Sequence, residues 1–230
     1  MLEIIGLSVE DAITIESLGG ERIELIQAFS EGGLTPSYGT VKEVAQKVKI
    51  PVNVMVRPHS RSFNYSKYDL EVMREDAKII KELGANNLVM GILDQDGLPD
   101  IKAMEYVLSS TDAKITFHRA FDECSDLLKA LEILKSYDRV DTILTSGGPG
   151  KAQDNVEVLK AVIENREHIN ILVGSGVSNS NLESLFRQLK NTNFHVGTAV
   201  RNGNYNDEIN MEELLRTVSK YRSLNMHKLL

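Results

Sequence analysis

The segment Thr116-Phe117-His118-Arg119-Ala120-Phe121-Asp122 places an imidazole, a guanidinium and a carboxylate within five consecutive positions. It stands where an apolar run ends and a helical pattern begins. Each ionisable group at the exit of a buried strand must be solvated, paired or used, because an unpaired charge away from water is costly. An imidazole can transfer protons, and a guanidinium can hold an anion bidentately. We therefore interpret this segment as the floor of a binding or catalytic site.

The elements that position this segment repeat one cycle of β-rich run, polar or glycine-bearing loop and amphipathic helix. The predicted strands are 2–7, 22–26, 52–57, 87–93, 114–118, 140–145, 170–174 and 194–199. The predicted helices are 9–18, 37–48, 67–83, 100–109, 125–136, 154–165, 179–190 and 210–223. Eight of each predict a (β/α)8 TIM barrel, a single α/β domain over 1–230 with a C-terminal helix and tail from about 206. A doubly wound open sheet is the alternative, but its G-x-G-x-x-G after the first strand is missing.

Local start and stop signals support these helices. Ser8-Val9-Glu10-Asp11 and Ser66-Lys67-Tyr68-Asp69 have the spacing of capping boxes. Thr35-Pro36 predicts an N-cap followed by proline at the first helical position. Gly19-Gly20 and Gly84 are expected to end the first and third helices.

Alternation along the predicted strands indicates which side chains enter the barrel. Apolar residues face the helices, and every second residue faces the interior. On this register the charged and imidazole side chains in the lumen are Glu3, Glu24, Arg57, His118 and His195. Barrel interiors are normally filled by branched apolar side chains. A polar lumen is therefore the strongest functional signal in the sequence.

Each of these side chains also has a purely structural interpretation. Glu3, Glu24, Arg57 and His118 can form an internal salt-bridge network, although such networks stabilise poorly because desolvation offsets most of the Coulomb gain. Two interpretations explain His195 equally well: a hydrogen-bonded core histidine and a functional histidine. Arg119, one residue beyond the strand face, is expected to reach the mouth of the barrel or to pair with Asp122.

The last three predicted strands lead into glycine-bearing loops. In the sixth strand the alternation predicts that Val140, Thr142 and Leu144 face the helices and that Thr145 faces the interior. Barrels often hold a phosphate between their final loops, where backbone N–H groups are exposed. The residues predicted to bind substrate from these loops are Thr145, Ser146, Gly174, Gly176 and Gly197.

Composition restricts the class of protein. There are 26 Lys and Arg against 33 Asp and Glu, a net charge of −7, with no Trp, 6% aromatic residues and no basic run. Nucleic acid is therefore not expected as a partner. No apolar run is long enough to cross a bilayer, and the first residues lack the basic stretch of a signal peptide. With one cysteine and hence no internal disulfide, we expect a cytoplasmic protein without membrane association, its oligomeric state open and a homo-oligomer included.

Five segments of the chain resemble the CutC family: Glu21-Arg22-Ile23-Glu24-Leu25, Glu31-Gly32-Gly33-Leu34-Thr35-Pro36-Ser37, Val56-Arg57-Pro58, Thr116-Phe117-His118-Arg119-Ala120-Phe121-Asp122 and Leu144-Thr145-Ser146-Gly147-Gly148. The likeness runs from the first predicted strand to about residue 200. The family is a TIM-barrel group named for copper homeostasis, so the resemblance implies that fold and a copper-related role. The site positions that it implies are Glu3, Glu24, Arg57, His118, Arg119 and Asp122.

Two positions depart from the pattern that many members show. Where they carry cysteine after the Glu-Leu pair, this chain has Ile26, and where they have Arg-Pro-Arg-Gly-Gly it has Arg57-Pro58-His59-Ser60-Arg61. The first change removes the thiolate that Cu(I) would prefer. A copper role would rest on His118, His195, His59 and carboxylates, a harder set suited to Cu(II) or Zn(II).

Two hypotheses therefore remain. The resemblance implies a protein that binds or buffers copper. The residue chemistry favours instead an enzyme acting on a small anionic metabolite, phosphorylated metabolites included. In it Arg57 and Arg119 orient the anion, and the acid–base candidates are Glu3, Glu24, His118 and Asp122. Two arginines repel cations and soft ligands are scattered, but the substrate, the reaction, any cofactor and any metal stay unidentified.

Overall fold

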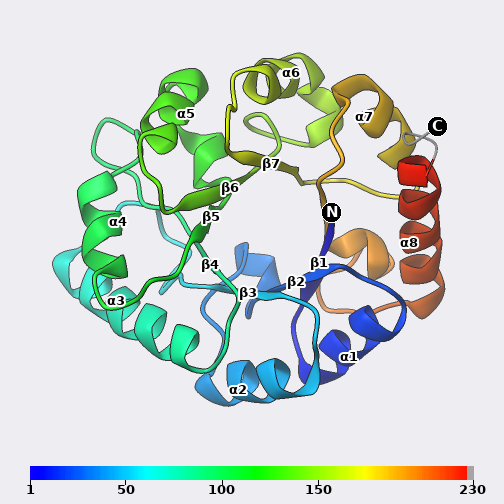
Figure 1. Cartoon of the computed structure of the whole chain (residues 1–230), viewed down its shortest axis with the longest axis horizontal. Coiled ribbons are helices and arrows are strands. Elements are labelled where there is room, and N and C mark those ends of the chain that lie inside the picture. The colour runs from blue at the N-terminus through cyan, green and yellow to red at the C-terminus, as the bar shows by residue number, and fades with distance from the viewer. Residues whose placement is uncertain (227–230) are drawn as a thin grey trace.

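A closed parallel barrel forms the centre of the computed structural model, which describes residues 1–226, and helices surround it (Figure 1). The strands are β1 (Leu2–Gly6), β2 (Arg22–Leu25), β3 (Val52–Met55), β4 (Leu88–Met90), β5 (Ile115–Phe117), β6 (Val140–Thr145), β7 (Asn170–Val173) and β8 (Phe194–Val196). The helices are α1 (Val9–Ser17), α2 (Tyr38–Lys47), α3 (Lys67–Glu82), α4 (Ile101–Leu108), α5 (Leu127–Lys135), α6 (Val156–Glu164), α7 (Leu182–Leu189) and α8 (Met211–Met226). The predicted TIM barrel is confirmed. Residues 227–230 of the predicted tail lie outside the described residues.

Several strands end before their hydrophobic runs do. β3 ends at Met55 and β5 at Phe117, so Arg57 and His118 stand just beyond the strand ends. In a barrel of parallel strands these ends gather at one face, where the loops carry the functional groups. The short 3-10 helix η2 (Arg119–Glu123) follows His118 at this face.

The helix starts depend on side chains that accept backbone N–H groups. Ser66 and Asp69 form the complete capping box expected for α3. Ser8 caps α1, but the Asp11 carboxylate accepts from Leu7 N, so this predicted box is only half formed. The N-cap predicted at Thr35 is wrong. Ser37 caps α2, while the Thr35 hydroxyl bonds the backbone N–H and C=O at position 57.

The sides predicted for the second half of β6 are also wrong, because the ladder between β5 and β6 contains a bulge. Ile115 pairs with Val140, but the next inward residue, Thr116, pairs with Thr142. A bulge sets two residues opposite one and moves every later side chain to the other face. Thr142 therefore lies beside the inward Thr116. Leu144 lines the interior cavity, and Thr145 turns away from it.

Most apolar side chains pack between the strands and the helices. A second, smaller cluster lies inside the barrel and consists of Ile5, Ile26, Met55 and Val89. The rest of the interior is markedly polar, with Glu3, Glu24, Asn53 and Thr116 each at most 3% exposed. Among the helices of residues 1–226, none is long and apolar enough to cross a membrane.

Arg201 joins the segment after the last strand of the barrel to the first strand and helix. Its fully buried guanidinium donates from Nη2 to Ile5 O at 2.8 Å and to Asp11 Oδ2 at 2.7 Å. The Asp11 carboxylate also accepts from Leu7 N, so one ion pair holds β1, α1 and the segment after β8 together.

Replacing Arg201 with Met should lower the free energy of unfolding by about 3–5 kcal/mol, because it leaves the Asp11 carboxylate buried without its partner. Urea denaturation followed by circular dichroism measures the loss. The matched control is Arg187→Met on α7, whose exposed pair with Glu183 should contribute no more than about 0.5 kcal/mol. Equal losses in the two variants would contradict the role of Arg201.

Candidate functional site

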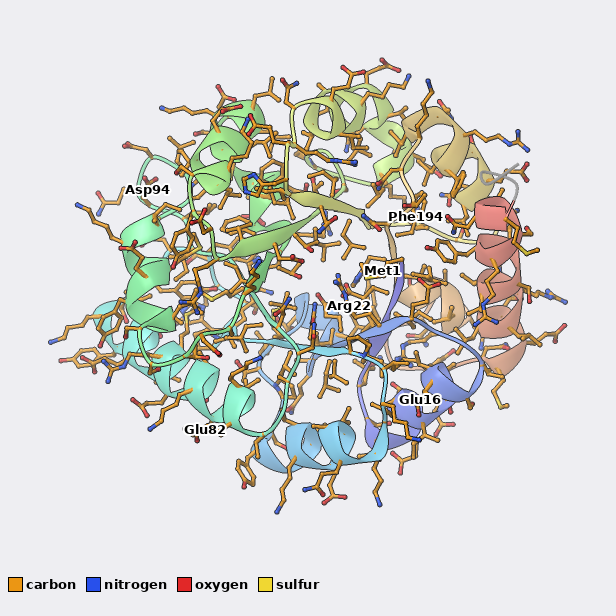
Figure 2. The ribbon with its side chains drawn as sticks, viewed as in Figure 1. Met1, Glu16, Arg22, Glu82, Asp94 and Phe194 are labelled. Atoms are coloured by element: carbon orange, nitrogen blue, oxygen red, sulfur yellow. The ribbon has the colours of Figure 1, made fainter. Side chains whose placement is uncertain are left out.

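Four ionisable side chains meet inside the barrel: Glu3 on β1, Arg22 and Glu24 on β2, and His195 on β8. Arg22 Nε donates to Glu3 Oε2, and His195 Nδ1 lies 2.8 Å from Glu3 Oε1. His195 Nε2 lies 3.8 Å from Glu24 Oε2. Strand register produces the grouping, since Glu3 is paired with Arg22 on one side and His195 on the other. Figure 2 shows Arg22 within the ring of strands.

Burial and mutual charge set the protonation of this group. Burial raises the pKa of Glu24 to about 7, against the opposing effect of His195. Burial also disfavours ionisation of Glu3, but Arg22 and His195 together hold the pKa of Glu3 below its usual value. Burial lowers the pKa of His195, yet the Glu24 and Glu3 carboxylates outweigh it and raise that pKa overall. Of the two carboxyls, Glu24 is therefore the one that exchanges a proton near neutral pH.

A cavity of about 510 Å³, the size of a small-molecule site, opens over this group at the C-terminal end of the barrel. Its ionisable lining includes Glu24, Arg57, His118, Arg119, Asp122 and His195. Its apolar floor includes Ile5, Ile26 and Met55. Glu3 is not among the residues that line it. Glu3 is buried beneath the cavity and contacts His195, which does line it.

His118 is held as a neutral hydrogen-bond donor. Its Nδ1 accepts from the backbone N–H of Ala120 at 3.2 Å, which leaves the proton of the neutral ring on Nε2. Burial, with the charges of Arg57 and Arg119, lowers the pKa of His118 to about 3. Its buried Nε2 has no hydrogen-bond partner in the described part of the chain. His118 therefore brings an unpaired N–H donor to the lining of the cavity.

Gly91 provides the room for this imidazole. A Cβ at position 91 would lie 2.6 Å from His118 Nδ1 and 2.8 Å from Cε1, which is too close for the ring to stay in place. On another side the ring packs on Phe63, with centroids 4.8 Å apart. The orientation of His118 is thus fixed by a glycine, an aromatic ring and a backbone N–H.

Arg57 is fixed in a similar way. Its Nη1 donates to Glu31 O at 3.1 Å and to Gly33 O at 3.2 Å, and its guanidinium carbon lies 4.6 Å from the centre of the Phe63 ring. Its buried Nε has no hydrogen-bond partner within residues 1–226. Arg57 therefore holds the loop after β2 and keeps Nε as an unpaired donor.

The main contacts of the Asp122 carboxylate are with the loop between β6 and α6, which it holds in place. Its carboxylate accepts from the Thr145 hydroxyl, from the Ser146 N–H and hydroxyl, and from the Gly148 N–H. Arg119 Nε donates to the same carboxylate at 2.8 Å, which confirms the pairing expected of Arg119. With its oxygens used in this way, Asp122 is a positioning group for Arg119, which lines the cavity.

The predicted substrate-binding residues of the last loops divide into two sets. Gly176 and Gly197 line the cavity. Thr145 and Ser146 do not: the bulge in β6 turns Thr145 outward, and both side chains bind Asp122. Gly174 also lies outside the lining, where its missing side chain leaves room for Leu144 and His195.

Three residues that shape the site were not predicted from the sequence. Arg22 has the same strand parity as Glu24, so the alternation that placed Glu24 inside could have found it. Gly91 stands in the apolar run 87–93, where an isolated glycine marks close approach of another group. Phe63 lies in the loop between β3 and α3, and no local pattern singles it out.

Comparison with known proteins adds the family. The model of the CutC family matches residues 1–200. The chain belongs to the CutC family. A family protein CutC of Enterobacter sp. strain 638 is 40% identical to this CutC family member over 184 residues, 80% of this chain and 74% of the relative. The human copper homeostasis protein cutC homolog is 38% identical over 197 residues, 85% of this chain and 72% of that protein.

Solved structures agree with this assignment. CutC from Streptococcus agalactiae superposes on this CutC family member with a TM-score of 0.80 at 31% identity, covering 86% of this chain and 98% of that one. N-(5'-phosphoribosyl)anthranilate isomerase from Pyrococcus furiosus superposes with a TM-score of 0.64 at 14% identity, covering 97% and 98%. The second likeness shows the barrel fold alone.

Replacing Glu24 with Gln should change how stability depends on pH. A carboxyl whose pKa is raised from 4.5 to about 7 binds its proton more tightly in the native state. The wild type should therefore lose up to about 3 kcal/mol relative to Glu24→Gln as pH rises from 4.5 to 8. Burial is the main cause of this raised pKa; Glu3 adds to it, and His195 and Arg22 oppose it. Urea titrations at each pH measure it, and parallel pH profiles for the two proteins would refute it.

Proposed function

We propose that this protein is an enzyme that binds a small anionic metabolite in the barrel cavity and transfers a proton on it. One observation carries the proposal. Three side chains that line the same cavity each have a buried polar atom without a partner among residues 1–226: Glu24 Oε1, Arg57 Nε and His118 Nε2. Unpaired buried polar atoms are costly, so three of them on residues that line one cavity are typical of a ligand site.

The two arginines supply the anion's counter-charge. Arg57 Nε is a donor held in place by the loop at Glu31 and Gly33 and by Phe63. Arg119 is oriented by Asp122 and by Ser146, to which its Nη2 donates at 3.1 Å. A guanidinium that is oriented in advance binds a carboxylate or phosphate with little loss of side-chain freedom.

Glu24 supplies the proton transfer. Its pKa of about 7 makes it a base and an acid of nearly equal availability at neutral pH. His195 is hydrogen-bonded to Glu3 and lies next to Glu24, so it can pass a proton within the buried group. We place this activity in the cytoplasm, an assignment supported by the single cysteine of the sequence.

The names of the relatives favour a second function, in copper homeostasis. The human relative carries that name and is 38% identical over most of this chain. Ligand atoms of Glu3, Glu24 and His195 lie within 4.8 Å of one another, a spacing that can surround a metal ion. A copper ion would then be the cargo of the protein.

The chemistry of these donors does not fit Cu(I). They are carboxylates and an imidazole, whereas Cu(I) prefers thiolate and thioether. Glu3 is already bonded to Arg22, whose charge repels a cation, and to His195. Position 26 holds isoleucine, and Met55 is the one sulfur-bearing residue in the described lining. We therefore assign no metal ligand in this group.

The anion proposal predicts that phosphate or pyruvate raises the melting temperature, because each binds the native state alone. Arg57→Gln should abolish most of that rise, since the shorter amide cannot place a charged donor in the cavity. Arg61→Gln, an exposed arginine of the same loop outside the lining, is the matched control and should keep it. Differential scanning fluorimetry measures both. An unchanged rise in Arg57→Gln would count against the proposal.

For copper, we expect Cu(I) to bind no more tightly than it binds scattered surface histidines and methionines. Competition against a chromogenic Cu(I) chelator measures the affinity. His195→Gln, which removes an imidazole of the buried group, should leave the result unchanged. Stoichiometric uptake that outcompetes the chelator and is lost in His195→Gln would favour the copper function over the enzyme.

A further inference from the structure

We propose that the substrate is a small carbonyl compound bearing an anionic group, and that Glu24 removes a proton from the carbon next to its carbonyl while His118 binds the carbonyl oxygen. This inference rests on the proposed function, because it names the substrate class of the same cavity. It is drawn from the pairing of a neutral donor with a buried carboxylate over an apolar floor.

His118 is suited to hold a carbonyl oxygen that becomes an enolate. Its Nδ1 is occupied by the Ala120 N–H, so Nε2–H is the group that it presents. A neutral imidazole fixed in this tautomer stabilises the developing negative charge on oxygen without competing for the substrate proton. Burial and the neighbouring arginines keep it neutral, with a pKa of about 3.

Glu24 is suited to a carbon acid. Its Oε1 is buried and has no partner within the described residues, so it is free to approach a C–H group. Glu24 comes from β2, His118 follows β5, and both line the cavity. Ile5, Ile26 and Met55 provide an apolar floor, which suits a C–H group better than a hydroxyl or an ammonium.

The step conserves atoms and electrons without any further reagent. The α C–H bond breaks and its proton passes to Glu24. The electron pair forms a C=C bond, and the carbonyl π pair moves to the oxygen that His118 Nε2–H holds. Arg57 binds the anionic group away from the reacting carbon. Return of a proton from Glu24 to the same carbon restores the carbonyl compound, with the enolate electron pair re-forming the C–H bond.

The lining does not favour an acyl-transfer reaction instead. Such chemistry needs a nucleophile hydrogen-bonded to a base. The hydroxyl-bearing side chains in the lining are Ser30, Ser175, Thr198 and Tyr205. Ser175 donates to Gly150 O, and no hydrogen bond joins any of the four to Glu24, His118 or His195 in the described residues. Proton transfer at carbon needs no such nucleophile.

The test is exchange of the α-hydrogen in D2O, because it reports the proposed step even when the full reaction is unknown. Pyruvate, 2-oxobutyrate and dihydroxyacetone phosphate are each incubated with the purified protein near neutral pD. Loss of the α-proton signal is followed by ¹H NMR. Binding of each compound is measured in parallel by its effect on the melting temperature.

The variants separate the roles. Glu24→Gln should lower the exchange rate roughly 100- to 10,000-fold. His118→Asn should lower it roughly 100-fold, since asparagine can still accept the Ala120 N–H but offers no donor at the Nε2 position. Both should keep the rise in melting temperature. The matched control is Glu82→Gln on the outer face of α3, which Figure 2 labels and which should exchange at the wild-type rate.

The outcomes distinguish this inference from the proposed function. Exchange that depends on Glu24 and His118 supports it. Compounds that raise the melting temperature through Arg57 but undergo no exchange above the Glu24→Gln rate overturn the inference and leave anion binding standing. The absence of both binding and exchange overturns the inference and the proposed function together.

Discussion

The ion pair between Arg22 and Glu3 allows charged groups to occupy the centre of a closed barrel, and the chemistry of the cavity depends on it. A carboxylate in this position would be neutralised if it stood alone, because burial strongly disfavours its charge. Arg22 and His195 keep Glu3 ionised, and Glu3 in turn keeps His195 in place beneath the cavity. Glu24 lies farther from its cationic neighbour, with His195 Nε2 at 3.8 Å, and burial raises its pKa to about 7.

The cavity therefore combines a carboxyl whose pKa is raised with an imidazole whose pKa is lowered. Glu24 holds its proton up to about neutral pH, and His118 is neutral far below it. Both shifts have burial as their largest cause, and the nearby arginines add to the shift of His118. An acid and a donor separated in this way can act on one ligand without exchanging a proton with each other.

Other polar residues hold the loops around these two side chains in place. Asp122 draws together the ends of β5 and β6, and through Arg119 it sets one wall of the cavity. Arg57 fixes the loop after β2 and stacks on Phe63, which also packs on His118. The site is thus assembled from loops that are tied to each other at the carboxyl ends of the strands, as is general in barrels of this kind.

The sequence by itself determined the eightfold cycle of strand and helix and the inward side of Glu3, Glu24 and His118. These follow from periodicity, which each segment carries in its own residues. Only the tertiary structure decided the sides of β6, because the bulge arises from its pairing with β5. It also decided that Thr145 and Ser146 bind Asp122, and that His118 is neutral. Hydrogen-bond partners and burial come from segments distant in the chain, so no local pattern contains them.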